Sequence, residues 1–181
     1  MKIKQKIFRY LGGYKILFEL IQKGFLIFQT YIDVFRQTDL SFLQGKFKTN
    51  IADQVVSMFK VVHSLLSLFC KDNPIHQDLL FQNFNLLTLI TRVDIGQLSL
   101  INEMLKGNHE LALSITEKRL KVFCEFIIQH GKKEIFLNIF NTLIDHPTHD
   151  IGNIQKKVLF VLLSEEYVDH INVTSLIILT V

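Results

Sequence analysis

The chain has 181 residues, of which 49% are hydrophobic, and 20 Lys and Arg against 17 Asp and Glu give a formal charge of +3. Only 2 Pro and 8 Gly residues are present, too few turn residues for a sandwich or barrel of many short strands. The small net charge, without a long block of one sign, argues against a dedicated nucleic-acid surface. The composition therefore favours a single all-α domain spanning residues 1–181, with a core of ordinary size.

The two cysteines, Cys70 and Cys124, lie far apart, each within an apolar helical pattern. This placement is typical of buried thiols in a reducing compartment rather than of a disulfide framework. The basic, apolar start of the chain is similar to a signal peptide, but Lys15, Glu19 and Lys23 interrupt every apolar run there. We therefore expect a cytoplasmic protein with no direct membrane insertion.

The N-terminal part predicts two helices followed by a less regular segment. Residues 2–10 place Ile3, Ile7 and Tyr10 on one stripe, and the Gly12-Gly13 pair ends this helix. A second helix begins near Gly13, with apolar residues at helical spacing: Ile16, Leu17, Leu20 and Ile21. The periodicity fades over residues 23–50, for which we predict a partly helical, variable connection.

The middle of the chain carries a strong helical signal at residues 51–71. Its apolar face consists of Val55, Phe59, Val62, Leu66 and Phe69. Asn73-Pro74 then supplies an N-cap and a proline at the first helical position, which predicts a helix to about Asn83. Its core residues are Leu79, Leu80 and Phe81, and residues 84–90 predict another short helix.

The C-terminal half predicts four helices with apolar faces. A helix over residues 97–106 is closed by Gly107-Asn108, and one over residues 110–129 is followed by Gly131 at an expected αL C-cap. The next helix ends before Pro147, and the last covers residues 149–163. In chain order, the apolar face of the first of these helices consists of Leu98, Ile101, Met104 and Leu105, and that of the second of Leu113, Leu120, Phe123, Phe126 and Ile127. The face of the third consists of Ile135, Phe136, Ile139, Phe140, Leu143 and Ile144, and that of the fourth of Ile151, Ile154, Val158, Leu159 and Leu162.

About eight short amphipathic helices must obtain their stability from packing on one another. They fit an armadillo-like α-solenoid or an irregular helical bundle, which periodicity alone does not separate. An exact repeat of about 34 residues is absent, which disfavours a tetratricopeptide array.

Three blocks of sequence resemble the RIH domain of ryanodine and inositol trisphosphate receptors. They are residues 9–22, with a Gly pair and Ile-Leu-Phe-Glu-Leu-Ile-Gln; residues 62–81, with Phe-Cys, an Asn-bearing turn and His-Gln-Asp-Leu-Leu; and residues 123–144, with two helices joined by His-Gly. Residues 23–50 and 168–181 depart from the pattern.

The resemblance implies an armadillo-like helical module on the cytosolic side of the endoplasmic reticulum or another intracellular membrane. Such a module would connect ligand binding to a remote calcium-release pore through contacts with other domains or subunits. Because the sequence shows no pore segment, we expect a channel fragment. A free-standing soluble armadillo-like adaptor that binds a protein partner is the alternative.

One group of basic residues, Lys2, Lys6 and Arg9, lies on a single face of the first predicted helix. A solvated helix face is the expected role of such a group. Binding of an anionic group such as a phosphate is the alternative. The resemblance adds to that alternative, because basic residues in similar positions contact inositol trisphosphate in the ligand-binding copy of the domain.

Other chemistry-bearing residues suggest no catalytic, cofactor or metal site. Residues 145–150 (Asp-His-Pro-Thr-His-Asp) gather four possible metal ligands but lack the spacing of a zinc site. His63 and His130 are expected to cap helices or to bond within the core rather than to activate a cysteine, and Lys132-Lys133 are expected to be exposed. No nucleophile elbow, P-loop or dinucleotide motif is present, so we expect a protein that is not an enzyme.

Overall fold

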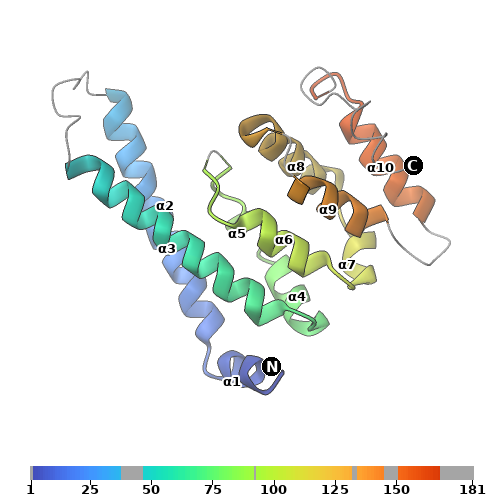
Figure 1. Cartoon of the computed structure of the whole chain (residues 1–181), viewed down its shortest axis with the longest axis horizontal. Coiled ribbons are helices and arrows are strands. Elements are labelled where there is room, and N and C mark those ends of the chain that lie inside the picture. Colours follow the sequence, from blue (N-terminus) through green and yellow to red (C-terminus); the bar gives the residue numbers. More distant parts are fainter. Residues whose placement is uncertain (1, 38–46, 92, 132–133, 145–150, 168–181) are drawn as a thin grey trace.

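The computed structural model describes residues 2–37, 47–91, 93–131, 134–144 and 151–167, and these residues form ten helices and no strand (Figure 1). The all-α prediction is confirmed, with ten described helices where about eight were predicted. The helices are α1 (Lys2–Tyr10), α2 (Gly13–Gln37), α3 (Phe47–Cys70), α4 (Pro74–Phe81), α5 (Phe84–Leu87), α6 (Gln97–Leu105), α7 (His109–Leu113), α8 (Glu117–His130), α9 (Glu134–Ile144) and α10 (Ile151–Leu162).

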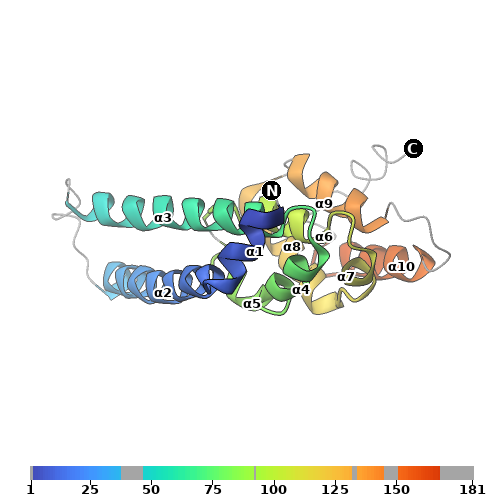
Figure 2. The ribbon, with the colours of Figure 1, turned by 90° about the horizontal axis from the view of Figure 1, so that it is seen from below.

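The helices lie beside one another in nearly the order in which the chain forms them. Helix α2 packs against α3, α3 against α6, α6 against α9, and α10 against both α8 and α9. The α2–α3 pair therefore lies at one end of the molecule and α10 at the other (Figure 1). In the view from below, α3, α6 and α9 form one row (Figure 2). This row fits both predicted architectures, the armadillo-like solenoid and the irregular bundle.

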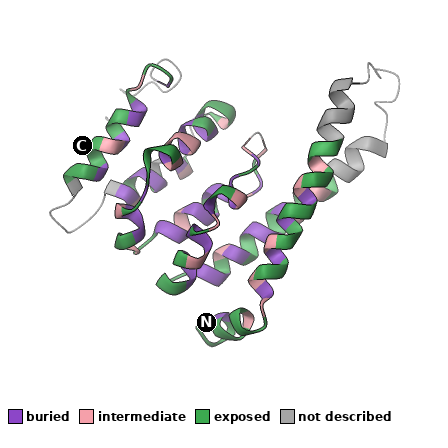
Figure 3. Cartoon of the chain, turned by 180° about the vertical axis from the view of Figure 1, so that it is seen from behind, coloured by how far each residue is buried: buried purple, intermediate pink, exposed green. Residues whose placement is uncertain are grey.

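One continuous core runs along the row of helices (Figure 3). The apolar faces predicted for residues 51–71 and 97–106 are confirmed, because Phe59, Val62, Leu66 and Phe69 are buried and Val55 packs against the core. The following four predicted residues of α6 are also buried: Leu98, Ile101, Met104 and Leu105. Since α6 contacts both α3 and α9, it is the central helix of the core.

The long helix predicted for residues 110–129 is wrong, because the structure divides it into α7 and α8. An N-cap at Thr116 marks the division, because its side chain accepts from Arg119 N–H at 3.4 Å and starts α8, whereas Asn108 caps the beginning of α7 by accepting from Leu111 N–H. Ile115 lies in the break and is fully buried, which anchors the turn. Gly131 has the expected positive φ of 73°, but its ψ of −176° is not that of an αL cap.

The segment predicted as a partly helical connection is more helical than expected. Helix α2 continues past Lys23 to Gln37, and α3 begins at Phe47. Gly24 lies inside α2 rather than at a break, and a Cβ there would stand 2.7 Å from Met58 Cε and 2.9 Å from Phe59 Cζ. The glycine therefore permits close approach of α2 and α3.

The apolar stripe predicted for α1 faces the wrong way for a core. Ile3, Ile7 and Tyr10 are 75%, 53% and 90% exposed, and the buried residue of α1 is Gln5. The prediction of a helix is confirmed, but this helix packs against α3 through its polar side rather than through its apolar stripe. Similar errors affect three predicted core residues on other helices, which are exposed: Ile16, Leu20 and Leu159.

Three buried glutamines donate hydrogen bonds to pairs of backbone carbonyls. Gln5 Nε2 donates to Leu68 O at 2.9 Å and Lys71 O at 3.0 Å, where α3 ends. Gln77 Nε2 donates to Glu103 O at 2.8 Å and Lys106 O at 3.0 Å, where α6 ends. Gln97 Nε2 donates likewise to two carbonyls just before α6: Ile90 O and Val93 O. These carbonyls have no helical partner of their own, so the glutamines satisfy them inside the molecule.

Within the described residues, one helical stretch has the length and composition of a membrane span, Asp53–Cys70 in α3, with a mean hydropathy of 1.2. Core helices of soluble proteins have the same properties. In this structure 33% of the stretch is buried, including Phe59, Leu66 and Phe69, and other apolar residues of the stretch lie at the surface of α3.

Replacing Gln77 with alanine should lower the free energy of unfolding by about 2–3 kcal/mol, because two carbonyls at the end of α6 lose their donor. Urea unfolding followed by circular dichroism measures this loss. The neighbouring exposed residue offers a matched control, since Asp78→Ala should change stability by no more than about 0.5 kcal/mol. Equal losses in the two variants would contradict the capping role of Gln77.

Candidate protein-interaction surface

An apolar groove of about 380 Å³ lies between α1 and α3. We call it the α1–α3 groove; it is lined by Lys4, Gln5, Phe8, Leu65, Leu68 and Phe69. The ring of Phe8 meets that of Phe69 edge to face, with centroids 5.4 Å apart. Together with the hydrogen bonds of Gln5, this contact fixes the wall that α1 contributes.

The outer face of α3 extends the apolar surface beyond the groove. Val61, Leu65 and Leu68 are 59%, 44% and 56% exposed and recur at helical spacing, and we call them the α3 stripe. The opposite side of the same helix is buried, as shown by the mixed colouring of α3 in Figure 3. An exposed apolar patch next to an apolar groove is typical of a surface that binds another protein.

The floor of the groove is supported by contacts that join α3 to α4. His76 stacks on Phe69 with ring centroids 4.2 Å apart, and its Nδ1 lies 3.0 Å from Phe69 O. Asn73 caps α4 by accepting from His76 N–H, and its Nδ2 donates to Gln5 Oε1 at 3.3 Å. The turn between α3 and α4 therefore ties α1 to both helices.

The predicted basic group is only partly brought together. Lys6 and Arg9 line a concavity of about 240 Å³ with Tyr10, whereas Lys2 is exposed on the same helix but does not line it. All three cations lie at the surface, which agrees with the expected solvated face. Anion binding at this concavity stays a prediction.

The two histidines considered as partners for a cysteine have other contacts. His63 is fully buried, with Nδ1 2.8 Å from Phe59 O and Nε2 3.3 Å from Leu87 O. His130 Nε2 lies 2.6 Å from Thr91 O, to which it donates. Burial raises the pKa of both Cys70 and Cys124 to about 12, so each is a neutral thiol at neutral pH. These contacts support the structural roles expected for both histidines.

Several candidates from the sequence fall on residues outside those described. They are the cluster at residues 145–150 and the Lys132-Lys133 pair. In the part of the chain that is described, no three His, Cys, Asp or Glu residues are grouped as a metal site would require.

A polar pocket of about 460 Å³, between α6, the start of α7 and α9, was not predicted from the sequence. Its lining residues are Asn102, Leu105, Lys106, Gly107, His109, Asn138, Asn141 and Thr142. Thr142 Oγ1 donates to Asn138 O at 2.7 Å and lies 3.2 Å from Asn102 Oδ1. Carboxamides and a hydroxyl can bind polar groups, but this hydroxyl is not bonded to a general base and therefore makes no activated nucleophile. The asparagines were missed because they join only when α6 and α9 pack.

Comparison with known proteins identifies one family: the family model described as RIH domain matches residues 1–169. Searches of curated proteins and of solved structures gave no match. The matched range includes all three blocks of sequence that resemble the RIH domain, together with the segment at residues 23–50. The predicted resemblance is therefore confirmed.

Stability should decrease as the pH falls below about 6.5, the ordinary pKa of histidine. Burial lowers the pKa of His63 and, with a smaller contribution from the charge of Arg9, that of His76. At a pH just below 6.5 the two histidines are therefore protonated more in the unfolded chain than in the folded chain, which favours unfolding. Urea unfolding at a series of pH values should show this loss, and His63→Gln should reduce it. His109→Gln, at an exposed histidine, provides the control. A pH dependence unchanged by His63→Gln would contradict the prediction.

Proposed function

Because the chain belongs to the RIH domain family, we propose that it is a non-enzymatic helical module of an intracellular calcium-release-channel-like protein. The RIH domain is found in receptor channels rather than enzymes, on their cytosolic side. The observation that carries the proposal is the family match over residues 1–169. In this role the chain scaffolds or transmits conformational change between neighbouring domains or subunits.

The rigid connection of α1, α3 and α4 supports a transmitting role. A force on α1 reaches α3 through Gln5 and Phe8, and Gln77 connects α4 to the end of α6. Because α6 contacts both α3 and α9, a displacement at the α1–α3 groove is carried along the row of helices. The α3 stripe and the groove are the surfaces proposed to contact a neighbouring domain or subunit.

Substituting Leu65→Glu and Leu68→Glu together should abolish co-purification of the chain with a channel subunit from its source cells. Both side chains are about half exposed, so the double variant should retain its circular dichroism spectrum. Phe160→Glu, at a 67% exposed residue of α10, is a matched control that should leave co-purification intact. Wild-type chain that enters no large membrane assembly would contradict the proposal.

The polar pocket supports a second candidate function, a soluble adaptor that binds an extended peptide. Each carboxamide in the pocket carries both a donor and an acceptor, as does each peptide unit. Asn102 comes from α6 and Asn138 and Asn141 from α9, so two neighbouring helices of the row present amides to one space. A volume of about 460 Å³ accommodates a short stretch of main chain rather than a whole domain.

The adaptor candidate predicts that peptides selected from a display library bind this pocket. Asn102→Ala with Asn138→Ala should weaken such binding by about tenfold, as expected for the loss of one or two hydrogen bonds. Asn153→Ala, at an exposed asparagine of α10, should have no effect in the same titration. Peptides that bind with equal affinity to the wild-type chain, to the double variant and to Asn153→Ala would exclude the pocket as their binding site.

A further inference from the structure

Helix α1 is attached to the protein by its polar side and exposes its apolar side. Gln5 is buried and bonded to the end of α3, and Phe8 packs on Phe69. By contrast, Ile3 is 75% and Tyr10 90% exposed, and Leu11, just after the helix, is 77% exposed. Two hydrogen bonds and a ring contact fix this orientation, so the exposure follows from specific docking. The arrangement leaves an apolar surface that something outside the described chain is suited to cover.

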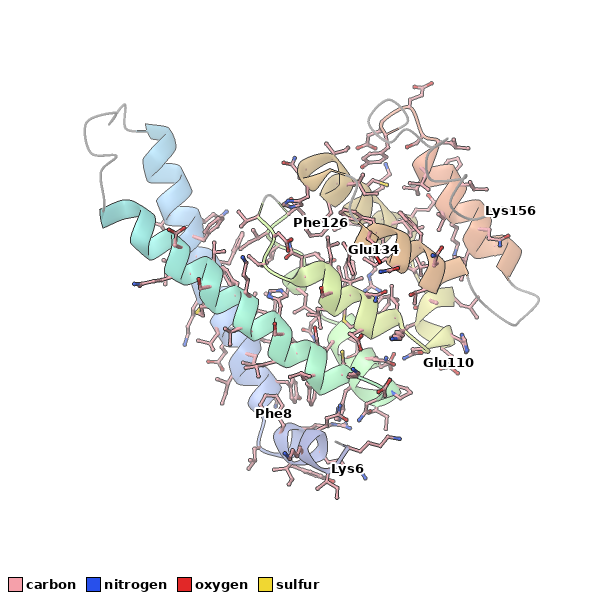
Figure 4. All side chains as sticks on the ribbon, viewed as in Figure 1. Lys6, Phe8, Glu110, Phe126, Glu134 and Lys156 are labelled. Atoms are coloured by element: carbon pink, nitrogen blue, oxygen red, sulfur yellow. The ribbon has the colours of Figure 1, made fainter. Side chains whose placement is uncertain are left out.

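The exposed apolar residues form a narrow stripe with cations on both sides. At about 100° per residue, Ile3, Ile7 and Tyr10 share one face of the helix, and we call them the α1 stripe. Lys2 and Lys6 project from one edge of this face, and Lys4 from the other. Figure 4 shows Phe8 toward the junction with α2 and α3, and Lys6 on the outer side of α1. The stripe is therefore a ridge along the outer side of α1, and its Tyr10 end borders the concavity shared with Lys6 and Arg9.

The charge around this ridge has a single sign. Five cations precede the first acidic residue of the chain, Glu19, and four of the five belong to α1. This local excess exceeds the formal charge of +3 carried by the whole chain. A surface that covers the α1 stripe must therefore be apolar at its centre and anionic around it.

We propose that the α1 stripe rests on the anionic surface of a lipid membrane. Ile3, Ile7 and Tyr10 would lie at the level of the headgroups and upper acyl chains, with the flanking lysines against lipid phosphates. A helix with basic edges, an apolar stripe and low overall hydrophobicity is suited to this interfacial position, which involves no crossing of the membrane but replaces the expectation of no direct membrane insertion. Arg9 adds a further cation on the side of Lys2 and Lys6.

The shape and charge of α1 favour this occupant over two others. A second copy of the chain would place the same cations against one another, which costs electrostatic energy. An acidic protein would need a groove deep enough to reach Lys4 and Lys6 on opposite edges of the ridge. A lipid surface yields around a convex helix and reaches both edges without such a groove.

Flotation of the full chain with lipid vesicles tests the proposal. The chain should bind vesicles of phosphatidylcholine with phosphatidylserine, should not bind phosphatidylcholine alone, and should dissociate as salt is raised. Ile3→Ser with Ile7→Ser should weaken binding by about tenfold or more, since two apolar side chains no longer enter the interface. Phe160→Ser removes an apolar side chain that is 67% exposed, between the values of Ile3 and Ile7, from the other end of the molecule and should leave binding unchanged.

Three results would overturn the proposal. The first is a folded wild-type chain that stays off phosphatidylserine vesicles at low salt. The second is vesicle binding that Ile3→Ser with Ile7→Ser leaves intact, or that Phe160→Ser reduces to the same extent. The third is saturable binding of an acidic amphipathic peptide, sensitive to the Ile3 and Ile7 substitutions, in the absence of vesicle binding; this would assign α1 to a protein partner.

Discussion

Hydrogen bonds from buried side chains to the ends of helices are the constraint on which this fold depends. The ten helices of the described residues bring many ends into a small molecule; each N-terminal end leaves N–H groups, and each C-terminal end leaves carbonyls, without helical partners. Gln5, Gln77 and Gln97 each donate to two carbonyls three residues apart. A glutamine suits this task because one amide nitrogen carries two hydrogens. Without these donors, helix ends inside the molecule would carry the cost of unsatisfied polar groups.

Some residues of the blocks that resemble the RIH domain take part in such contacts. Within the block at residues 62–81, His76 stacks on Phe69 and Gln77 caps the end of α6. Arg119 continues the pattern: its guanidinium lies 4.0 Å from the Phe81 ring, and Nη2 donates to Phe81 O. The resemblance to the RIH domain therefore rests on residues that pack the helices together. It is direct support for the fold, whereas it supports the function only by analogy with the assemblies that contain this domain.

Apolar periodicity correctly predicted which face is buried in helices that pack through their apolar side. It failed for helices whose orientation is set by another interaction. Helices α3 and α6 bury all or most of the stripes expected of them, and α9 buries Phe136, Ile139, Phe140 and Leu143 of its own stripe. In α1, two hydrogen bonds from Gln5 outweigh the apolar stripe, and no pattern within nine residues announces a partner more than sixty residues away. The helical course of α2 past Gly24 was not predicted for the same reason, because the close neighbours of this glycine, Met58 and Phe59, lie on another helix. The polar pocket likewise exists only after α6 and α9 meet.

The polar attachment of α1 explains why two of the surfaces suited to binding, the α1 stripe and the α1–α3 groove, lie at this helix. Its helix is held by one glutamine and one aromatic contact, so most of its circumference is available to partners. Helix α6, contacted by α3, α4 and α9, has six of its nine residues buried and contributes to binding through the polar pocket, which Asn102 lines. A helix fixed firmly by a small area presents its remaining side chains in one orientation and loses little entropy on binding. Attachment through Gln5 therefore leaves Ile3 and Ile7 exposed and held in one orientation. Had these isoleucines been buried in the core instead, they would not be available to a binding partner.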